Sequence, residues 1–126
     1  MLSAEEQNRY SRHIRLDEVG LDGQEKLKAA KVLVVGAGGL GCPILQYLTA
    51  AGVGTIGIAD GDEVAYSNLQ RQVLFSTNDV GKKKTSVTIK KLRDQNEFVR
   101  FIEIDVYLTR ENVLEVLTDF DIIIAV

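Results

Sequence analysis

The segment VLVVGAGGLGCPILQYL, residues 32–48, places a short run of β-branched residues directly before a glycine-rich turn and a helical pattern. Gly36, Gly38 and Gly41 follow the spacing G-x-G-x-x-G, and Gly39 leaves the loop still barer of side chains. Glycines let the backbone turn tightly there, so that free N–H groups and a helix N-terminus can face an anion. The segment predicts a phosphate-binding strand–turn–helix unit, with a purely structural tight turn as the alternative.

The rest of the chain repeats this alternation of strand and helix patterns. Strands that alternate with helices form a parallel sheet through right-handed crossovers. We therefore expect an α/β fold, a Rossmann-like parallel sheet with helices on both faces, preceded by a short N-terminal helical segment. The expected strands are 31–35, 54–60, 99–107 and 121–126, and the expected helices of this part are 40–52, 82–95 and 110–117.

The N-terminal segment predicts a helical arm, residues 1–30, ahead of a nucleotide-binding half, residues 31–126. Ser3 and Glu6 have the spacing of a capping box, which predicts that a helix starts there and runs over 4–15. A second short helix is expected over 22–30.

Composition narrows the classes of partner. The chain has 126 residues and a formal net charge of −3, which argues against general binding to nucleic acid or to an anionic membrane. A single cysteine allows no internal disulfide and no structural zinc site from this chain alone. No apolar stretch approaches the length of a membrane span, so we expect a cytoplasmic protein.

An acidic residue follows the glycine turn at the distance expected of a ribose ligand. Asp60 ends the second expected strand, 19 residues after Gly41, where its carboxylate can accept hydrogen bonds from ribose hydroxyls. Its alternative role is to cap a turn. Asp62 and Glu63 are interpreted as turn residues that could also assist a metal. These features alone fit an NAD- or FAD-dependent oxidoreductase.

Cations beyond the second strand fit a dinucleotide less well. Lys82, Lys83 and Lys84 are expected in the first turn of a helix, where they oppose the helix dipole and favour a nearby anion. The motif SNLQRQ, residues 67–72, adds Arg71, whose planar guanidinium suits phosphoryl oxygens. A solvated helix face and a polar surface turn are the respective alternatives. Taken together, the two clusters favour a nucleoside triphosphate.

Three further features are only weak evidence of a function. Arg9, Arg12 and Arg15 recur at helical spacing, which taken alone indicates a solvent-facing stripe. His13 is interpreted as a surface or packing residue. Cys42 lies near a helix N-terminus, but burial against the sheet is favoured over a nucleophilic role.

In this order, RYSRHI, GAGGLGCPILQYLTAAGVGTIGIAD, SNLQRQ and VGKKK resemble the ThiF/MoeB/HesA adenylyltransferases, relatives of the ubiquitin-activating enzymes. The resemblance implies ATP- and Mg²⁺-dependent adenylation of the C-terminal Gly-Gly carboxylate of a ubiquitin-like sulfur carrier of the thiamin or molybdopterin type. It places Gly39 beside the α-phosphate and Asp60 on the ribose. It also implies that the phosphates are held by Asn68, Arg71, Lys84 and, from the other subunit of a homodimer, Arg12.

The resemblance also implies a second half that this sequence does not contain. In the family, a strand like DIIIAV leads into an aspartate that binds magnesium, and zinc cysteines can follow. We therefore expect that the chain belongs to a longer protein and that this piece is inactive alone. An NAD/FAD oxidoreductase and a non-catalytic adaptor for a ubiquitin-like partner remain the alternatives.

Overall fold

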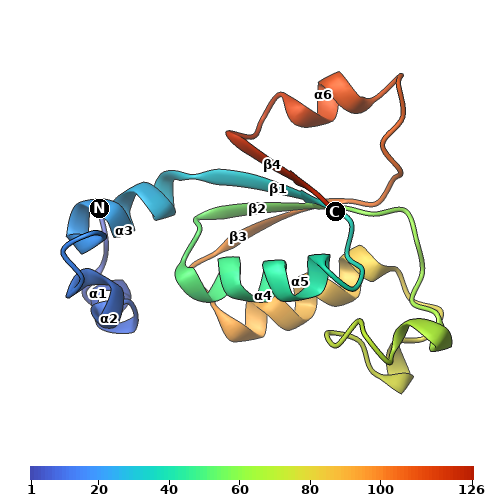
Figure 1. Cartoon of the computed structure of the whole chain (residues 1–126), viewed down its shortest axis with the longest axis horizontal. Coiled ribbons are helices and arrows are strands. Elements are labelled where there is room, and N and C mark those ends of the chain that lie inside the picture. Colours follow the sequence, from blue (N-terminus) through green and yellow to red (C-terminus); the bar gives the residue numbers. More distant parts are fainter.

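The computed structural model describes all 126 residues and contains one four-stranded parallel sheet in the order β3-β2-β1-β4 (Figure 1). In the central register, Val34 of β1 lies opposite Ile58 of β2 and Ile124 of β4. Because all strands run in the same direction, their carboxyl ends meet at one edge. The strands are β1 Lys31–Val35, β2 Thr55–Ala59, β3 Arg100–Ile104 and β4 Ile122–Ala125.

Helices lie on both faces of the sheet. The helices α4 (Gly41–Ala51) and α5 (Lys84–Gln95) lie side by side on one face, and α6 (Val113–Leu117) lies on the other (Figure 1). The expected Rossmann-like α/β fold is thus confirmed. None of the helices is long and apolar enough to cross a membrane.

The core lies mainly between the sheet and the α4–α5 layer. Leu33 and Val34 of β1 are fully shielded from solvent, which explains why this strand is apolar on both faces. Val87 and Leu92 of α5 are both buried. The edge strand β4 is more open, with Ile122 53% exposed.

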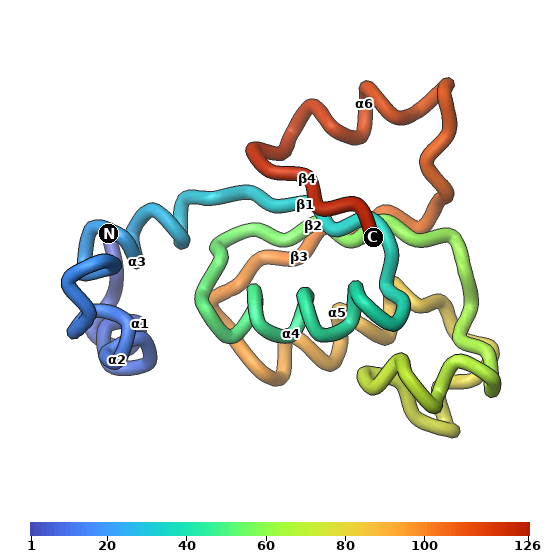
Figure 2. The backbone as a smooth tube through the Cα atoms, viewed as in Figure 1, coloured from blue at the N-terminus to red at the C-terminus, as the bar shows by residue number.

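The glycine turn sets where α4 begins. A Cβ atom built on Gly41 would lie 1.9 Å from the carbonyl oxygen of Gly36, so no larger residue fits without a backbone shift. The helix ends as expected at Gly52, whose φ of 87° places it in the left-handed region that favours glycine. The turn therefore directs the N-terminus of α4 toward the carboxyl edge of the sheet (Figure 2).

The N-terminal arm differs from its prediction. The capping box of Ser3 and Glu6 is confirmed, but the helix expected over 4–15 is divided at Tyr10. Tyr10 is buried against Gly52, and its hydroxyl accepts a hydrogen bond of 2.8 Å from Asn96 Nδ2. This anchorage to the main body outweighs helix continuation. The arm consists of α1 Ala4–Arg9, α2 Ser11–Ile14 and α3 Gly20–Ala29.

The long connection between β2 and α5 is ordered by burial and by ion pairs. Leu74 and Phe75 are buried in the core, between the short 3₁₀ helices η1 (Tyr66–Asn68) and η2 (Thr77–Asp79). Lys91 Nζ of α5 donates to the carbonyl oxygen of Leu74 and lies 2.7 Å from Asp79 Oδ2. The motif SNLQRQ is therefore held against the body of the protein.

Candidate functional site

A pocket of about 600 Å³ opens at the carboxyl edge of the sheet, where the glycine turn, the loop after β2 and the start of α5 meet. Most of the predicted site residues line it, but Asn68 and Arg12 do not. Its lining consists of Gly36, Gly38, Gly39, Leu40, Gly41, Asp60, Asp62, Arg71, Gln72, Lys84 and Val126.

The glycine turn presents unused hydrogen-bond donors to this pocket. The N–H groups of Gly38, Gly39 and Leu40 donate no hydrogen bond within the chain, whereas the Cys42 N–H already bonds to the Gly38 carbonyl oxygen at 3.0 Å. A Cβ on Gly39 would lie 3.4 Å from Arg71 Cδ, so the turn passes directly beside that arginine. Free amides at the start of a helix are suited to bind an anion.

Asp60 connects the glycine turn to the loop that follows β2. Its Oδ2 accepts a hydrogen bond of 2.8 Å from the N–H of Ala37, and its Oδ1 accepts one of 2.8 Å from the N–H of Asp62. The alternative capping role is thus present in the structure. Each carboxylate oxygen can accept a second hydrogen bond, so ribose binding stays a compatible prediction.

Only one of the three consecutive lysines reaches the pocket. The helix α5 starts at Lys84, so the expectation that Lys82 and Lys83 lie in its first turn is wrong. Lys83 is solvent-exposed and pairs with Asp105 at 2.5 Å, which raises the pKa of Lys83. Lys82 and Lys83 are solvent-exposed, as in the alternative interpretation, because α5 begins only after them. Lys84 is 5% exposed and lines the pocket.

The charges of the pocket are two cations and two carboxylates. Lys84 Nζ lies 3.8 Å from Asp62 Oδ2, at the outer limit of an ion pair. Arg71 is exposed and makes no ion pair or hydrogen bond through its side chain. An anionic ligand would therefore find one fixed and one unpaired cation.

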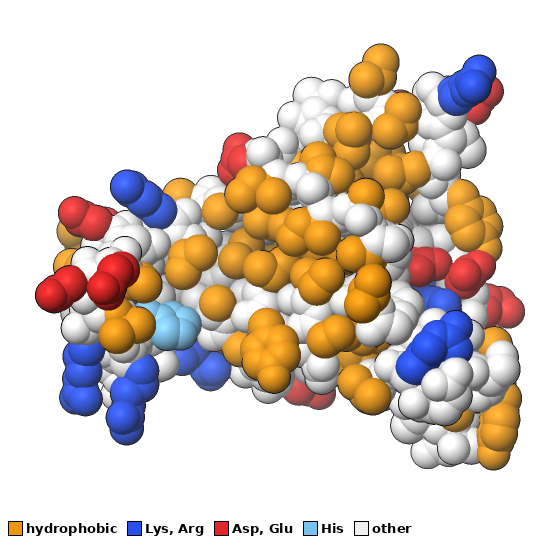
Figure 3. Space-filling model, viewed as in Figure 1, with side chains coloured by type: hydrophobic (Ala, Val, Ile, Leu, Met, Phe, Trp, Pro, Cys, Tyr) orange, Lys and Arg blue, Asp and Glu red, His pale blue; other side chains and the backbone are white.

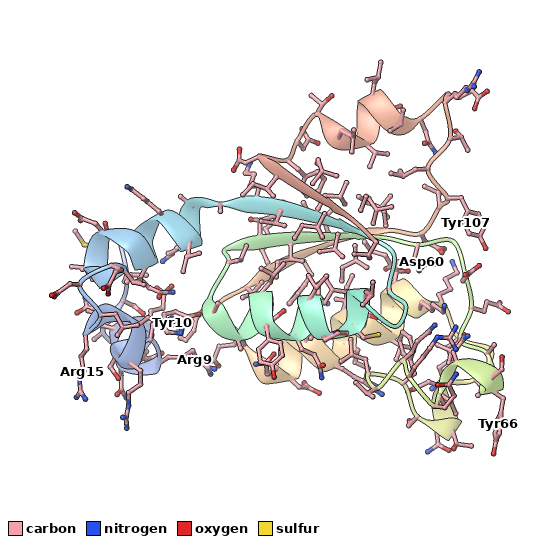
Figure 4. The ribbon with its side chains drawn as sticks, in the orientation of Figure 1. Arg9, Tyr10, Arg15, Asp60, Tyr66 and Tyr107 are labelled. Atoms are coloured by element: carbon pink, nitrogen blue, oxygen red, sulfur yellow. The ribbon has the colours of Figure 1, made fainter.

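Sequence reasoning did not select two residues of this region. Gln72 belongs to SNLQRQ but was not chosen as a ligand, although it is buried in the pocket wall. The Tyr107 hydroxyl donates a hydrogen bond to Asp62 Oδ1, which raises the pKa of Tyr107. Tyr107 follows β3 at the carboxyl edge, near Asp60 (Figure 4). This position was the available signal, because ligands of such sheets bind there.

Tyr107 also belongs to a smaller neighbouring pocket of about 180 Å³. The two pockets share Gly36, Asp60, Asp62 and Val126. Most of the remaining wall of the smaller pocket is apolar and comes from Val35, Ala59, Val106, Tyr107 and Leu108. The polar pocket thus continues into an apolar one. This arrangement suits a ligand that has a charged group at one end and a flat aromatic base at the other.

Other predicted residues lie away from the pocket. Asn68 Oδ1 accepts a hydrogen bond of 3.1 Å from the N–H of Ala65, within its own 3₁₀ turn. Arg12 is exposed on α2, at the opposite end of the sheet from the pocket (Figure 1). His13 packs in the arm, hydrogen-bonded to Gln24 at 3.0 Å. Cys42 is buried as expected, and burial raises the pKa of its thiol.

No group of three or more His, Cys, Asp or Glu side chains is placed to hold a metal ion. Both oxygens of Asp60 already accept backbone hydrogen bonds, and Asp62 faces Tyr107 and Lys84. These residues do not form a dedicated metal site.

A protein-family sequence model described as "ThiF family" matches residues 10–126 of the chain. The chain belongs to the ThiF family. The resemblance seen in the sequence is thereby confirmed.

Two curated relatives of this ThiF family member are adenylyltransferases by name. The sulfur carrier protein adenylyltransferase of Thermus thermophilus is 52% identical over 120 residues, which are 95% of this chain and 44% of the relative. The probable molybdopterin-synthase adenylyltransferase of Porphyra purpurea is 45% identical over 122 residues, or 97% and 32% of the two chains. The chain thus spans less than half the length of these relatives.

Solved structures have the same fold. E. coli TcdA, a tRNA N6-threonylcarbamoyladenosine dehydratase solved in complex with ATP, matches with a TM-score of 0.92 and 27% identity. That match covers 99% of this chain and 51% of TcdA. E. coli MccB with ATP matches with a TM-score of 0.81 and 37% identity, over 96% of this chain and 37% of MccB.

Proposed function

We propose that the chain is the nucleotide-binding part of an enzyme that uses ATP to adenylate the C-terminal Gly-Gly carboxylate of a small ubiquitin-like sulfur carrier. Residues 1–30 form its arm, and residues 31–126 form the nucleotide-binding half. The observation that carries the proposal is one pocket in which free glycine-turn amides lie with Arg71 and Lys84. The names of the relatives from Thermus thermophilus and Porphyra purpurea support the reaction class.

The shape of the two adjoining pockets suggests how ATP lies. The ribose lies near Asp60, and the base occupies the apolar pocket that Tyr107 lines. The α-phosphate faces the free amides of Gly38 and Gly39, because these donors lie at the start of α4. The remaining phosphates extend toward the side of the pocket lined by Arg71 and Lys84.

Asn68 and Asp62 are the remaining predicted site residues. The Nδ2 of Asn68 donates no hydrogen bond within the chain, so this donor is available to a phosphate if the turn adjusts. Asp62 holds Tyr107 and lies next to Lys84, so its role is to place two other side chains.

The proposed chemistry needs no catalytic base from this chain. A peptide carboxylate is already ionised at neutral pH, so its oxygen can attack the α-phosphorus directly. A new O–P bond forms, the bond to the bridging α,β-oxygen breaks, and pyrophosphate leaves with the electron pair. Arg71 and Lys84 stabilise the negative charge that spreads over the phosphates, and the turn amides fix the geometry.

Magnesium would partly neutralise the phosphates in such a reaction. Since Asp60 and Asp62 are engaged with other groups, this chain supplies no dedicated site for the ion, and the steps above do not depend on one. The magnesium aspartate that the resemblance implies stays a prediction.

The proposed role of Arg12 at the phosphates requires a second copy of the chain. It lies on α2, far from its own pocket, so we propose that the partner's copy of this arginine enters the pocket in a homodimer. Figure 3 shows hydrophobic side chains gathered across the face that contains α4. Tyr47 of α4 and Val73 of the loop before α5 are 76% and 65% exposed, and both line a groove next to α5. This surface is available to a partner subunit.

The rival oxidoreductase shares the glycine turn and Asp60. It leaves unexplained why the chain buries Lys84 in the pocket wall, next to an unpaired Arg71. A triphosphate accounts for both cations. A non-catalytic adaptor accounts for neither, because it has no need of a charged nucleotide pocket.

The test is exchange of labelled pyrophosphate into ATP by the full-length protein, with thiamin-type and molybdopterin-type carriers that end in Gly-Gly. We expect exchange with one carrier and none with its form lacking the last glycine. Arg71→Ala should slow exchange roughly 10- to 1000-fold, since it removes one charge partner of the transition state. Arg110→Ala, an exposed arginine outside the pocket, serves as the control. Wild-type exchange by Arg71→Ala would refute the phosphate role.

A further inference from the structure

The side-chain amide of Gln72 is buried and makes no hydrogen bond. The residue is 3% exposed, and its Oε1 is shielded from solvent and has no hydrogen-bond partner. Its Nε2 donates no hydrogen bond within the chain either. An unpaired buried amide is costly. Only Oε1 is fully buried, so Nε2 is the free donor that a ligand can reach. Gln72 lines the same pocket as the glycine turn.

The backbone of Gln72 is firmly placed. Its N–H donates to the carbonyl oxygen of Asn68 at 2.8 Å, and its own carbonyl oxygen accepts from the N–H of Phe75 at 3.1 Å. Lys91 holds the next turn through Leu74. The side chain is thus positioned by the fold before any ligand arrives.

The amide lies against the glycine turn. A Cβ atom built on Gly38 would lie 3.6 Å from Gln72 Nε2. The Gly38 N–H is unused as well, so the Gln72 amide and a free backbone donor belong to the same part of the pocket wall. An oxygen atom of an anion could accept from both at once.

We propose that Gln72 is a nucleotide-binding residue whose Nε2 donates a hydrogen bond to an α-phosphate oxygen of ATP. The inference rests on the proposed function and adds a ligand to it. The α-phosphate is the acceptor because Nε2 lies at the free amides of the turn. Arg71 and Lys84 serve the outer phosphates. The neutral amide fixes the position of the reacting phosphorus without adding charge.

The test compares adenosine, AMP and ATP as titrants of the full-length protein by calorimetry. Gln72→Leu has a similar shape and no donor, so AMP and ATP should each bind roughly 10- to 100-fold more weakly, as for loss of a hydrogen bond to a charged group. Adenosine should bind as before. Gln70→Leu is the matched control, because Gln70 is exposed in the same loop and does not line the pocket. Unchanged AMP binding, or an equal loss for adenosine, would overturn the proposal.

A second measurement needs no substitution and holds if Gln72→Leu fails to fold. The side-chain amide resonance of Gln72 in the ¹⁵N spectrum should shift downfield on addition of AMP and not of adenosine. No response to AMP would count against the contact. Arg71→Ala distinguishes a failure of the proposed function from a failure of the role of Gln72. If it weakens ATP binding while Gln72→Leu does not, the proposed function survives and the role of Gln72 falls.

Discussion

Replacing Lys84 by methionine should separate function from stability. In the free protein the lysine is buried, and its one ionic partner is Asp62, at 3.8 Å. Methionine has a similar length and can fill the space of the lysine stem. The substitution therefore removes the charge and leaves the packing of the first turn of α5 nearly intact.

The size of each effect follows from the surroundings of the ammonium group. Two unit charges about 4 Å apart attract by roughly 4 kcal/mol at an effective dielectric constant near 20. The side chain of Asp62 is 51% exposed, so solvent screening reduces this to about 0–1 kcal/mol. Removal of a buried charge offsets part of that loss. Unfolding free energy should thus change by no more than about 1 kcal/mol, whereas loss of a phosphate contact should slow adenylation roughly 10- to 1000-fold.

The assay is pyrophosphate exchange together with urea unfolding of the same preparations. Lys83→Met is the matched control, since Lys83 is the preceding residue, is exposed and pairs with Asp105 outside the pocket. We expect the control to exchange at the wild-type rate. Wild-type exchange by Lys84→Met, or a large loss of stability without a loss of exchange, would refute the assignment of Lys84 to the phosphates.

Three other perturbations test separate parts of the account. Gly41→Ala should destabilise the protein by roughly 1–3 kcal/mol in urea unfolding, because its Cβ would meet the Gly36 carbonyl oxygen at 1.9 Å. Gly39→Ala is the control and should fold normally, since a Cβ on Gly39 makes only an ordinary contact. A hydrogen bond from Lys91 lowers the pKa of Asp79 from 3.8 to about 2, so its carboxylate stabilises the fold above pH 4, and this contribution is lost as the pH falls through 2. The stability advantage over Asp79→Asn, roughly 2 kcal/mol at pH 7, should fall to about half by pH 3, and an advantage independent of pH would contradict the ion pair. Mixing Arg12→Ala with Arg71→Ala should restore about a quarter of the wild-type exchange, since roughly half of the re-formed dimers are mixed and each has one complete site; no recovery on mixing would argue against an arginine acting in trans.

Patterns along the chain were sufficient for the sheet and for the glycine turn. The segment Val32–Val35 of β1 is a continuous apolar run because both faces of the strand are covered, and that burial is visible in the sequence. At Gly41 the backbone approaches the Gly36 carbonyl oxygen too closely for a side chain, and Gly36 has a positive φ of 107° that favours glycine. Such local causes can be recognised without a structure.

Tertiary contacts decided the features that the sequence did not reveal. The break at Tyr10 depends on its burial against Gly52, and the different fates of Lys83 and Lys84 depend on where the chain turns into α5. The unpaired amide of Gln72 becomes notable only when its surroundings are known. In each case the local pattern fits more than one outcome, and the surroundings of the residue in the fold select between them.

The most direct test of the central claim is a calorimetric titration of the full-length protein with ATP and magnesium, with NAD as the competing titrant. We predict that ATP binds, that NAD neither binds nor competes, and that Arg71→Ala weakens the ATP signal. Binding of NAD without a response to ATP would contradict the account and restore the dinucleotide interpretation of the glycine turn.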